Sequence, residues 1–412
     1  MNSPHFILIL ISGIIILDYI FWLVSNLLNE ESRKQPLSEE GARIFDATEY
    51  AKSVSYGSAQ FRVEFITRTS SAIVLLTVIL FGGFAWLDDV IRTRIDNELL
   101  VTTAFVGILV LVVSLATLPI KYYSTFVIEE RFGFNKSTKA LFFQDAVKQL
   151  ILSLLLVLPL TYALAWIYQS LEGQFWFYAW LLFASVSLFM FVFGVRLFLP
   201  MFNKLKPLPE GALRTAVEEY CQSQGFPLSK LYELDASKRS TKLNAFFSGM
   251  GKVKIIGLYD TLIEKLTVEE SVAVLAHEVG HYKRKHIYWY FLFSNVQTVA
   301  IFALMGWLLG NSNLSRALGA DQMSFHLGLV AFFILLSPVS KLADIVGFWL
   351  SRRNEYEADQ YSIETYPGAT EFMDSALRKL SVESLSNLNP HPLFVALNYT
   401  HPPILDRLAA LK

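Results

Sequence analysis

Long apolar runs alternate with charged segments along most of this chain. Seven of the runs are long enough to cross a bilayer as helices, for which about 20 residues are needed. They lie at residues 6–27, 71–90, 99–120, 150–171, 176–199, 287–310 and 324–350. The first run has no basic residue before it and no small-residue cleavage site after it, so we expect a retained span and not a signal peptide. The pattern predicts a mostly α-helical membrane protein with seven transmembrane helices.

Lysine and arginine are distributed unequally among the connections. Segments 29–70 and 121–149, the long segment after the fifth run and the tail after the seventh are basic, whereas the opposite connections offer only Arg92, Arg94 and Arg316. The positive-inside rule therefore places the N-terminus outside and the C-terminus in the cytoplasm, and an odd number of spans agrees with this. We expect a multi-pass protein of a bacterial inner membrane or of the endoplasmic reticulum.

Composition supports the membrane assignment and narrows the possible partners. The 412 residues are 53% hydrophobic with a mean hydropathy of +0.42, too apolar for an ordinary soluble protein. A net charge of -1 argues against nucleic acid as a partner. The single cysteine, Cys221, cannot form an internal disulfide. The lipid bilayer is thus the first partner that the sequence predicts.

The composition changes after Pro200, where segment 206–211 (KPLPEG) marks the start of a non-membrane region. We expect an N-terminal membrane domain over residues 1–206, with five spans. A second domain should cover 207–412, with the last two spans and the tail. Within it, 211–224 is typical of a helix, 231–234 of a strand, and 244–249 with 252–258 of a hairpin around Gly249, Met250 and Gly251. The sequence predicts a small α+β domain on the cytoplasmic side.

A polar segment before the sixth run contains the sequence HEVGH at residues 277–281. Thr267 followed by Glu270 is typical of a capping box, so a helix should begin there and carry this sequence in its interior. His277 and His281 then point to the same side and suit two imidazoles on one tetrahedral metal ion. Glu278 should lie close enough to act on a water molecule bound to that metal. This is the H-E-x-x-H arrangement of zinc hydrolases, although the same pattern also arises by chance on a polar helix face.

A catalytic zinc ion needs a third protein ligand and one open position. A third histidine at a short fixed spacing is excluded, because Arg284 stands where that form has glycine and His286 comes too early. If the helix continues from the motif into the sixth span, Glu355, just past the seventh span, lies at a depth that matches the two histidines. The expected ligand set, two histidines and a distant glutamate, is gluzincin-like.

Two further acids lie near Glu355. Asp359, four residues later, should share its face and orient a ligating histidine. Glu357 should point elsewhere and be solvated. The bland alternative is that the whole acidic run is an exposed amphipathic helix.

These residues resemble the type I CAAX prenyl protease family of integral-membrane zinc metallopeptidases. Similar segments are spread over most of the chain. They are 130–135 (ERFGFN), 207–211 (PLPEG), 237–240 (SKRS), 244–249 (NAFFSG), 277–281 (HEVGH), 353–359 (RNEYEAD) and 399–407 (YTHPPILDR). Lys242 departs from the histidine expected in eukaryotic members. The short outer loops and a tail without an endoplasmic-reticulum retrieval signal fit a bacterial member.

The resemblance implies roles for individual residues. Zinc would be held by His277, His281 and Glu355, with Glu278 as the catalytic base. Asp359, His401 and Arg407 would support the active site. The resemblance also implies seven helices around a large aqueous chamber, capped on its cytoplasmic side by the zinc domain. The expected activity is that of a zinc metalloendopeptidase, with CAAX-type processing of prenylated proteins.

An extended peptide substrate needs a strand to pair with, and the segment Asn244, Ala245, Phe246, Phe247 is suited to be an edge strand that binds it main chain to main chain. Two alternatives stay open at this stage. One is a membrane-protein quality-control protease, and the other is a multi-span transporter with a non-catalytic metal site. A protease with its metal inside the bilayer fits poorly, because Lys283, Arg284 and Lys285 follow the motif at once.

Overall fold

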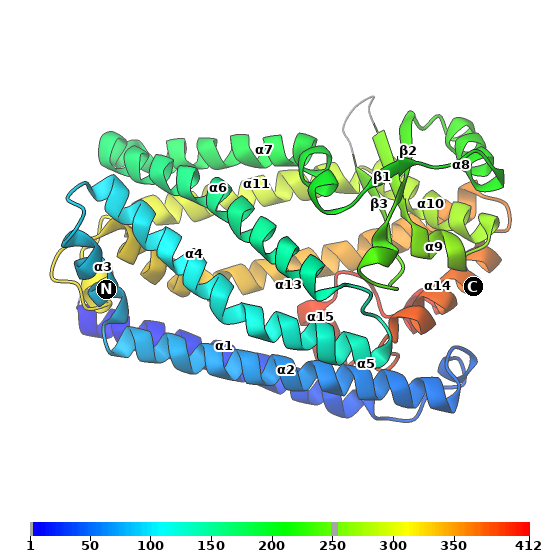
Figure 1. The fold of residues 1–412 in the computed structure, drawn as a ribbon, viewed down its shortest axis with the longest axis horizontal. Helices are drawn as coiled ribbons and strands as arrows, with labels where there is room; N and C mark the ends of the chain where they lie inside the picture. Colours follow the sequence, from blue (N-terminus) through cyan, green and yellow to red (C-terminus); the bar gives the residue numbers. More distant parts are fainter. Residues whose placement is uncertain (1–2, 249–253) are drawn as a thin grey trace.

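The computed structural model describes residues 3–248 and 254–412. Its long helices run roughly parallel to the longest axis, and the sheet with its surrounding helices lies at one end (Figure 1). The N-terminus lies at the opposite end from the sheet and the C-terminus at the same end (Figure 1). The expected mostly helical class with a small sheet is confirmed.

The long helices account for the apolar runs. They are α1 (Pro4–Arg33), α2 (Ala47–Leu80), α4 (Glu98–Tyr123), α6 (Lys139–Leu171), α7 (Phe175–Phe202), α11 (His286–Leu308) and α13 (Phe325–Thr365). Six stretches in the described residues qualify as membrane spans, because α6 and α7, separated by a 3₁₀ turn at Glu172–Gln174, form one stretch, Lys139–Phe202. The chain is therefore a multi-pass membrane protein, and the count of seven spans stays a prediction.

The second expected span, 71–90, is wrong in its bounds. The helix α2 ends at Leu80, and a short separate helix α3 (Gly83–Arg92) follows. Gly82 has φ 68°, a left-handed conformation that glycine adopts without a steric penalty and that interrupts a helix. The apolar run is continuous in sequence, but the helix is interrupted at this glycine. At its other end α2 reaches back to Ala47, so much of the expected connector 29–70 is helix.

The long helices form a closed ring of neighbours. Each helix in the series α1, α2, α3, α4, α6, α7, α11, α13 contacts the next one, and α13 contacts α1. The main hydrophobic core of this part involves the start of α1, α3, the end of α6 and α12 (Asn313–Ala317). All of these lie at the end away from the sheet (Figure 1). Burial along the spans is low, since at most 17% of the residues in the most apolar window of any span are buried.

A lysine on one of the long helices has a partner that the sequence did not indicate. Lys341 and Asp344, three apart on α13, could form an i,i+3 pair. Lys341 instead pairs with Asp18 of α1. The pairing follows from the packing of α1 against α13, which brings an acid from the far end of the chain within reach.

The remaining elements surround a four-stranded sheet with the order β1-β2-β4-β3. The strands are β1 (Leu205–Pro207), β2 (Leu228–Leu234), β3 (Ala245–Ser248) and β4 (Lys254–Tyr259). The strand β2 pairs with β4 in parallel, and β1 and β3 are antiparallel to their neighbours. The expected hairpin pairs β3 with β4, and its connection around Gly249, Met250 and Gly251 lies outside the described residues.

Helices pack on this sheet and on each other to form the second core. They are α8 (Ala212–Ser223), α9 (Asp260–Lys265), α10 (Val268–Lys283) and α14 (Ala369–Ser384). Outside this core, α15 (Pro392–Asn398) contacts α13 and α1, α16 (Ile404–Ala410) contacts α14, and the single turn α5 (Glu130–Phe132) precedes α6. Leu258, Leu262 and Leu275 are among its buried residues. The motif helix α10 contacts α8, α13 and α14, so it occupies the centre of this end of the molecule.

Candidate metal centre

The helix α10 begins as the capping box predicts. The Thr267 hydroxyl accepts a hydrogen bond from the Glu270 amide at 3.2 Å, and the Glu270 carboxylate accepts one from the Thr267 amide at 2.8 Å. Glu270 is also tied to α14 by Ser375 at 2.6 Å and by Lys379 at 2.7 Å. The start of α10 is thereby fixed, and with it the direction in which the motif residues project.

His277 and His281 project from successive turns of α10 toward the same point. Their Nε2 atoms are 3.1 Å apart. The expected continuation of this helix into the sixth span is wrong, because α10 ends at Lys283 and Lys285 adopts a left-handed conformation with φ 61°. The two histidines nevertheless meet the glutamate expected from depth alone.

Glu355 reaches this point from α13, which continues well past its apolar part to Thr365. Its Oε2 lies 3.4 Å from Nε2 of His277, and its Oε1 lies 3.2 Å from Nε2 of His281. One ligand atom from each of the three residues lies within 4.8 Å of the others. The approach of α10 to α13 is close at Gly280, where a Cβ atom would lie 3.1 Å from both the Cα and the carbonyl oxygen of Ala358.

These distances agree with the geometry of bound zinc. Ligands about 2.0–2.2 Å from a tetrahedral Zn²⁺ are separated from each other by roughly 3.3–3.6 Å. The two Nε2 atoms are 3.1 Å apart, Oε1 of Glu355 lies 3.2 Å from His281, and Oε2 lies 3.4 Å from His277, so both carboxylate oxygens face the imidazole pair. Oε2 of Glu355 is buried and has no hydrogen-bond partner among the described residues, so a buried acceptor is available. Two imidazoles and one carboxylate are the donor set of many catalytic zinc sites, and the residues fit the ion.

Asp359 contacts the ring nitrogen of His277 that faces away from the other ligands, as expected from its position one turn after Glu355. Its Oδ1 accepts from Nδ1 of His277 at 2.7 Å, which leaves the Nε2 lone pair free for a metal. Burial by itself lowers the pKa of His277, but the hydrogen bond to Asp359 and the neighbouring carboxylate of Glu355 outweigh it and raise that pKa to about 9. The acids around this ring therefore favour positive charge, which suits a cation.

Arg407 comes from α16, far along the chain, and is buried beside the two acids. It donates to Asp359 through Nε at 2.9 Å and through Nη2 at 2.6 Å, and its Nη1 lies 3.6 Å from Oε2 of Glu355. The tail thus folds back to the site. The structure brings five of the residues named from sequence into one cluster: His277, His281, Glu355, Asp359 and Arg407.

A cavity of about 610 Å³ opens beside this cluster. Glu278 and His401 both line it, and His401 lies with Nε2 3.5 Å from Oε1 of Glu355. The His401 side chain is 64% exposed, so it is accessible to a molecule in the cavity. Glu278 has no hydrogen-bond or ion-pair partner among the residues that the structure describes, which leaves its carboxylate available for a proton.

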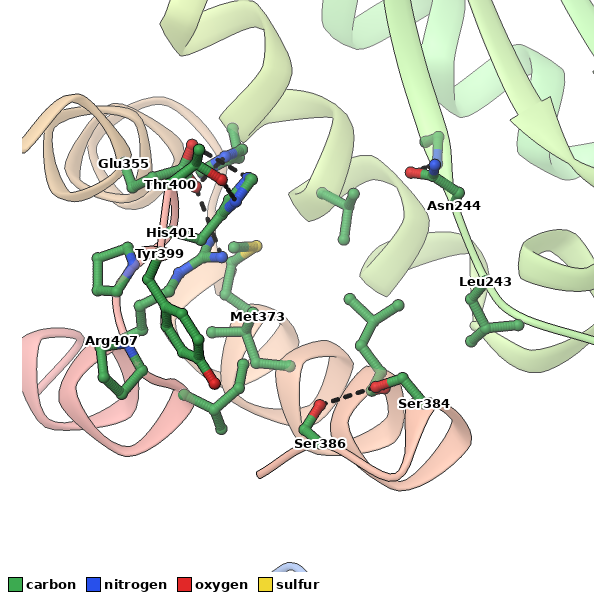
Figure 2. A pocket seen from close by; sticks show the side chains of 18 of the residues that line it. Leu243, Asn244, Glu355, Met373, Ser384, Ser386, Tyr399, Thr400, His401 and Arg407 are labelled. Atoms are coloured by element: carbon green, nitrogen blue, oxygen red, sulfur yellow. Dashed lines mark hydrogen bonds and ion pairs between the residues drawn. The ribbon is translucent and has the colours of Figure 1, made fainter. Parts of the chain in front are cut away.

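The expected substrate segment lies across the cavity. Figure 2 shows Glu355, Thr400 and His401 gathered on one side, with Leu243 and Asn244 opposite. Ala245 also lines the cavity, and β3 is an edge strand of the sheet. Phe246 and Phe247 belong to β3, but their side chains are outside the described part. Apolar residues form another wall: Leu262, Val274, Met373, Leu377 and Leu380.

Two residues near the metal ligands were missed by sequence reasoning. His286, set aside as too early for a ligand, lies with Nδ1 3.0 Å from Nδ1 of His281. Glu357, expected to be solvated, lies with Oε2 3.2 Å from Nε2 of His286 and is 40% exposed. The only signal in the sequence was a histidine between a basic segment and an apolar run, together with an acid in the same run as Glu355.

Comparison with known proteins matches the chain in two parts. Residues 26–204 match the family model for the CAAX prenyl protease N-terminal part with five membrane helices, and residues 207–412 match the model for peptidase family M48. A CAAX prenyl protease 1 homolog of Arabidopsis thaliana is 33% identical over 97% of this chain and 96% of its own length. The homolog of Homo sapiens is 31% identical over 90% of this chain and 88% of its own.

A solved structure is also similar. The crystal structure of S. mikatae Ste24p superposes with a TM-score of 0.92 at 29% sequence identity, and the match covers 98% of this chain and 99% of that one. The similarity therefore extends through the membrane helices as well as the sheet and the motif helix.

Proposed function

The chain belongs to peptidase family M48, in the group with a CAAX prenyl protease N-terminal part, and we propose that it is a zinc metalloendopeptidase that processes the C-termini of prenylated proteins. One observation carries the proposal. The ligand atoms of His277, His281 and Glu355 converge within 4.8 Å beside Glu278, in a cavity large enough for a peptide segment. The printed names of the relatives supply the substrate class.

The residues divide the chemistry between them. When bound by His277, His281 and Glu355, Zn²⁺ supplies Lewis-acid activation of a water molecule and of the peptide carbonyl. Glu278 accepts a proton from the attacking water as the C–O bond to the carbonyl carbon forms, and returns it to the amine nitrogen as the C–N bond then breaks. His401, exposed in the cavity, is placed to donate to the carbonyl oxygen as negative charge develops there.

Arg407 has a different task in this proposal. It is buried and bonded to Asp359 through Nε and Nη2, and it also lines the substrate cavity, so it supports the site from the cavity wall. It keeps Asp359 charged and oriented toward His277, and it offsets the negative charge of Glu355.

The substrate should lie extended along β3. An edge strand leaves main-chain donors and acceptors unpaired, and a peptide can add to them as a further strand. The apolar wall formed by Leu262, Val274 and Met373 suits an aliphatic side chain of the peptide.

The membrane part is proposed to enclose a chamber with seven spans. The ring of helix contacts supports a hollow interior. We place the peptidase end in the cytoplasm and the N-terminus outside, in keeping with the distribution of basic residues. Division into a membrane domain at 1–206 and a peptidase domain at 207–412 remains part of this proposal.

The test uses purified full-length protein with a farnesylated and an unfarnesylated peptide of the same sequence. Glu278→Gln should retain zinc and lose cleavage, and Glu355→Ala should lose zinc. Glu269→Gln, at an exposed position of the same helix, is the matched control and should behave as the original protein. Cleavage by Glu278→Gln would remove the base assignment, and full zinc content in Glu355→Ala would mean another third ligand.

The two peptides separate the substrate classes. Preference for the farnesylated peptide supports CAAX processing, whereas equal cleavage of both favours a quality-control protease. Zinc binding without any cleavage would revive the transporter alternative, which the family assignment otherwise leaves without support.

A further inference from the structure

The two histidine ligands differ in what holds them. The ring of His277 is hydrogen-bonded directly to the carboxylate of Asp359. His281 contacts a second imidazole, that of His286, which in turn contacts Glu357. The geometry depends on Lys285, whose left-handed backbone ends α10 and starts α11 at His286. Non-glycine residues rarely adopt this conformation. Here it accompanies the placement of the His286 ring against His281.

The hydrogen bonds in this row allow only one arrangement of protons on neutral rings. A metal-bound His281 uses the lone pair of Nε2, so its single N–H is on Nδ1. That N–H donates to Nδ1 of His286 across 3.0 Å. The N–H of His286 is then on Nε2 and donates to Oε2 of Glu357 across 3.2 Å. A carboxylate can only accept, and this sets the direction of the row.

Glu357 is itself held in place. Its Oε1 accepts from Nε of Arg353 at 3.1 Å, one turn earlier on α13. His286 is buried, with 6% of its surface exposed, while Glu357 lies at the edge of a separate cleft of about 370 Å³ lined also by Arg284 and Trp289. The row therefore runs from the ligand His281 outward to a cleft that shares no lining residue with the substrate cavity.

We propose that His286 and Glu357 are positioning residues that orient the second histidine ligand and fix its tautomer, as Asp359 does for the first. The inference rests on the proposed zinc site and adds to it. Without an acceptor at Nδ1, His281 would be free to rotate or to place its proton on Nε2, where it could not bind a metal. Loss of such outer partners typically lowers metal affinity by about 10–100-fold.

The experiment measures zinc affinity of the full-length protein by competition with a chelator. His286→Ala removes the acceptor and should weaken zinc binding by about 10–100-fold. In His286→Asn the side-chain oxygen occupies nearly the place of Nδ1, so this variant should stay close to the original protein. Glu357→Ala leaves His286 in place but unanchored and should weaken binding by a smaller factor.

His326→Ala is the matched control for loss of a buried histidine. His326 lies at the end of α13 away from the metal site, is 1% exposed, and contacts Asp88 of α3. Its loss should therefore lower stability without changing zinc affinity. A second readout is the visible spectrum of the Co²⁺-loaded protein, which responds to ligand orientation. His286→Ala should alter this spectrum and His286→Asn should not.

The outcomes separate this inference from the proposed function. If the original protein binds no zinc, the metal site itself is wrong. If it binds zinc and His286→Ala binds it equally well, only the positioning role is overturned. Equal losses in His286→Ala and His286→Asn would also overturn it, because the acceptor would then not matter. Should His286→Ala fail to fold, unchanged affinity and an unchanged Co²⁺ spectrum in Glu357→Ala, at a partly exposed position, would overturn it as well.

Discussion

Gly280 controls the distance between the two helices that supply the metal ligands. A methyl group there would lie 3.0 Å from Cβ of Tyr361 and 3.1 Å from both Cα and the carbonyl oxygen of Ala358. Two of these three atoms belong to the backbone of α13, which cannot move aside as a flexible side chain can. In Gly280→Ala, α10 and α13 would have to separate by a few tenths of an ångström.

Two opposing effects decide the stability change. Overpacking in a filled interior costs roughly 1–3 kcal/mol. Alanine in place of glycine inside a helix contributes about 1 kcal/mol in the other direction. We therefore expect Gly280→Ala to be destabilised by about 0–2 kcal/mol. The effect on zinc should be clearer, because metal–ligand distances tolerate only about 0.2 Å. A shift of Glu355 relative to His277 by more than this should reduce zinc affinity by about tenfold or more.

The assay combines thermal unfolding with zinc competition on the purified protein. Gly347→Ala is the matched control, because Gly347 also lies inside a helix but a methyl group there would meet only the hydroxyl of Tyr290, at 3.8 Å. The control should be as stable as the original protein or slightly more so, with the same zinc affinity. If Gly280→Ala matched the control in both measurements, close packing at this residue would not set the ligand geometry.

Three further predictions concern the surroundings of the site. Arg407→Lys keeps the charge but loses the two-point contact with Asp359, so it should lower the free energy of unfolding by about 1.5–3 kcal/mol. Arg68→Lys, at an exposed position, is the control and should leave it unchanged. Equal melting temperatures of the two variants would contradict this prediction. Removal of zinc by a chelator should abolish cleavage and lower the melting temperature of the original protein but not of Glu355→Ala, and added Zn²⁺ should reverse both effects. Burial by itself raises the pKa of Glu270, but hydrogen bonds from Lys379, Ser375 and Thr267 outweigh it and hold this pKa below the usual 4.5. Its contribution to stability is therefore present above pH 4.5 and lost as pH falls through the lower folded value, so acid should destabilise the original protein more than Glu270→Gln, and parallel pH profiles would refute the assignment.

Sequence reasoning succeeded where the relevant distances are short along the chain. The capping box at Thr267 and Glu270 and the meeting of His277 with His281 both follow from the geometry of one helix turn. The long helices were also predicted, because a helix that crosses a bilayer needs about 20 consecutive apolar residues, and such a run is visible in the sequence. The error at residues 71–90 came from Gly82, whose left-handed conformation breaks the backbone without breaking the run of apolar residues.

The sequence by itself determined that two imidazoles face one point and that an acid one residue away could serve them, since a regular helix converts spacing into direction. Glu355 was expected from its depth and from the family resemblance, but only the tertiary structure decided its contacts with both histidines, the two-point contact of Arg407 with Asp359, and the positions of His286 and Glu357 beside His281. These contacts join residues from helices whose relative positions depend on how α10, α11, α13 and α16 pack. Such packing depends on the complementary shapes of many side chains on several helices. The spacing of residues along one helix does not reveal it.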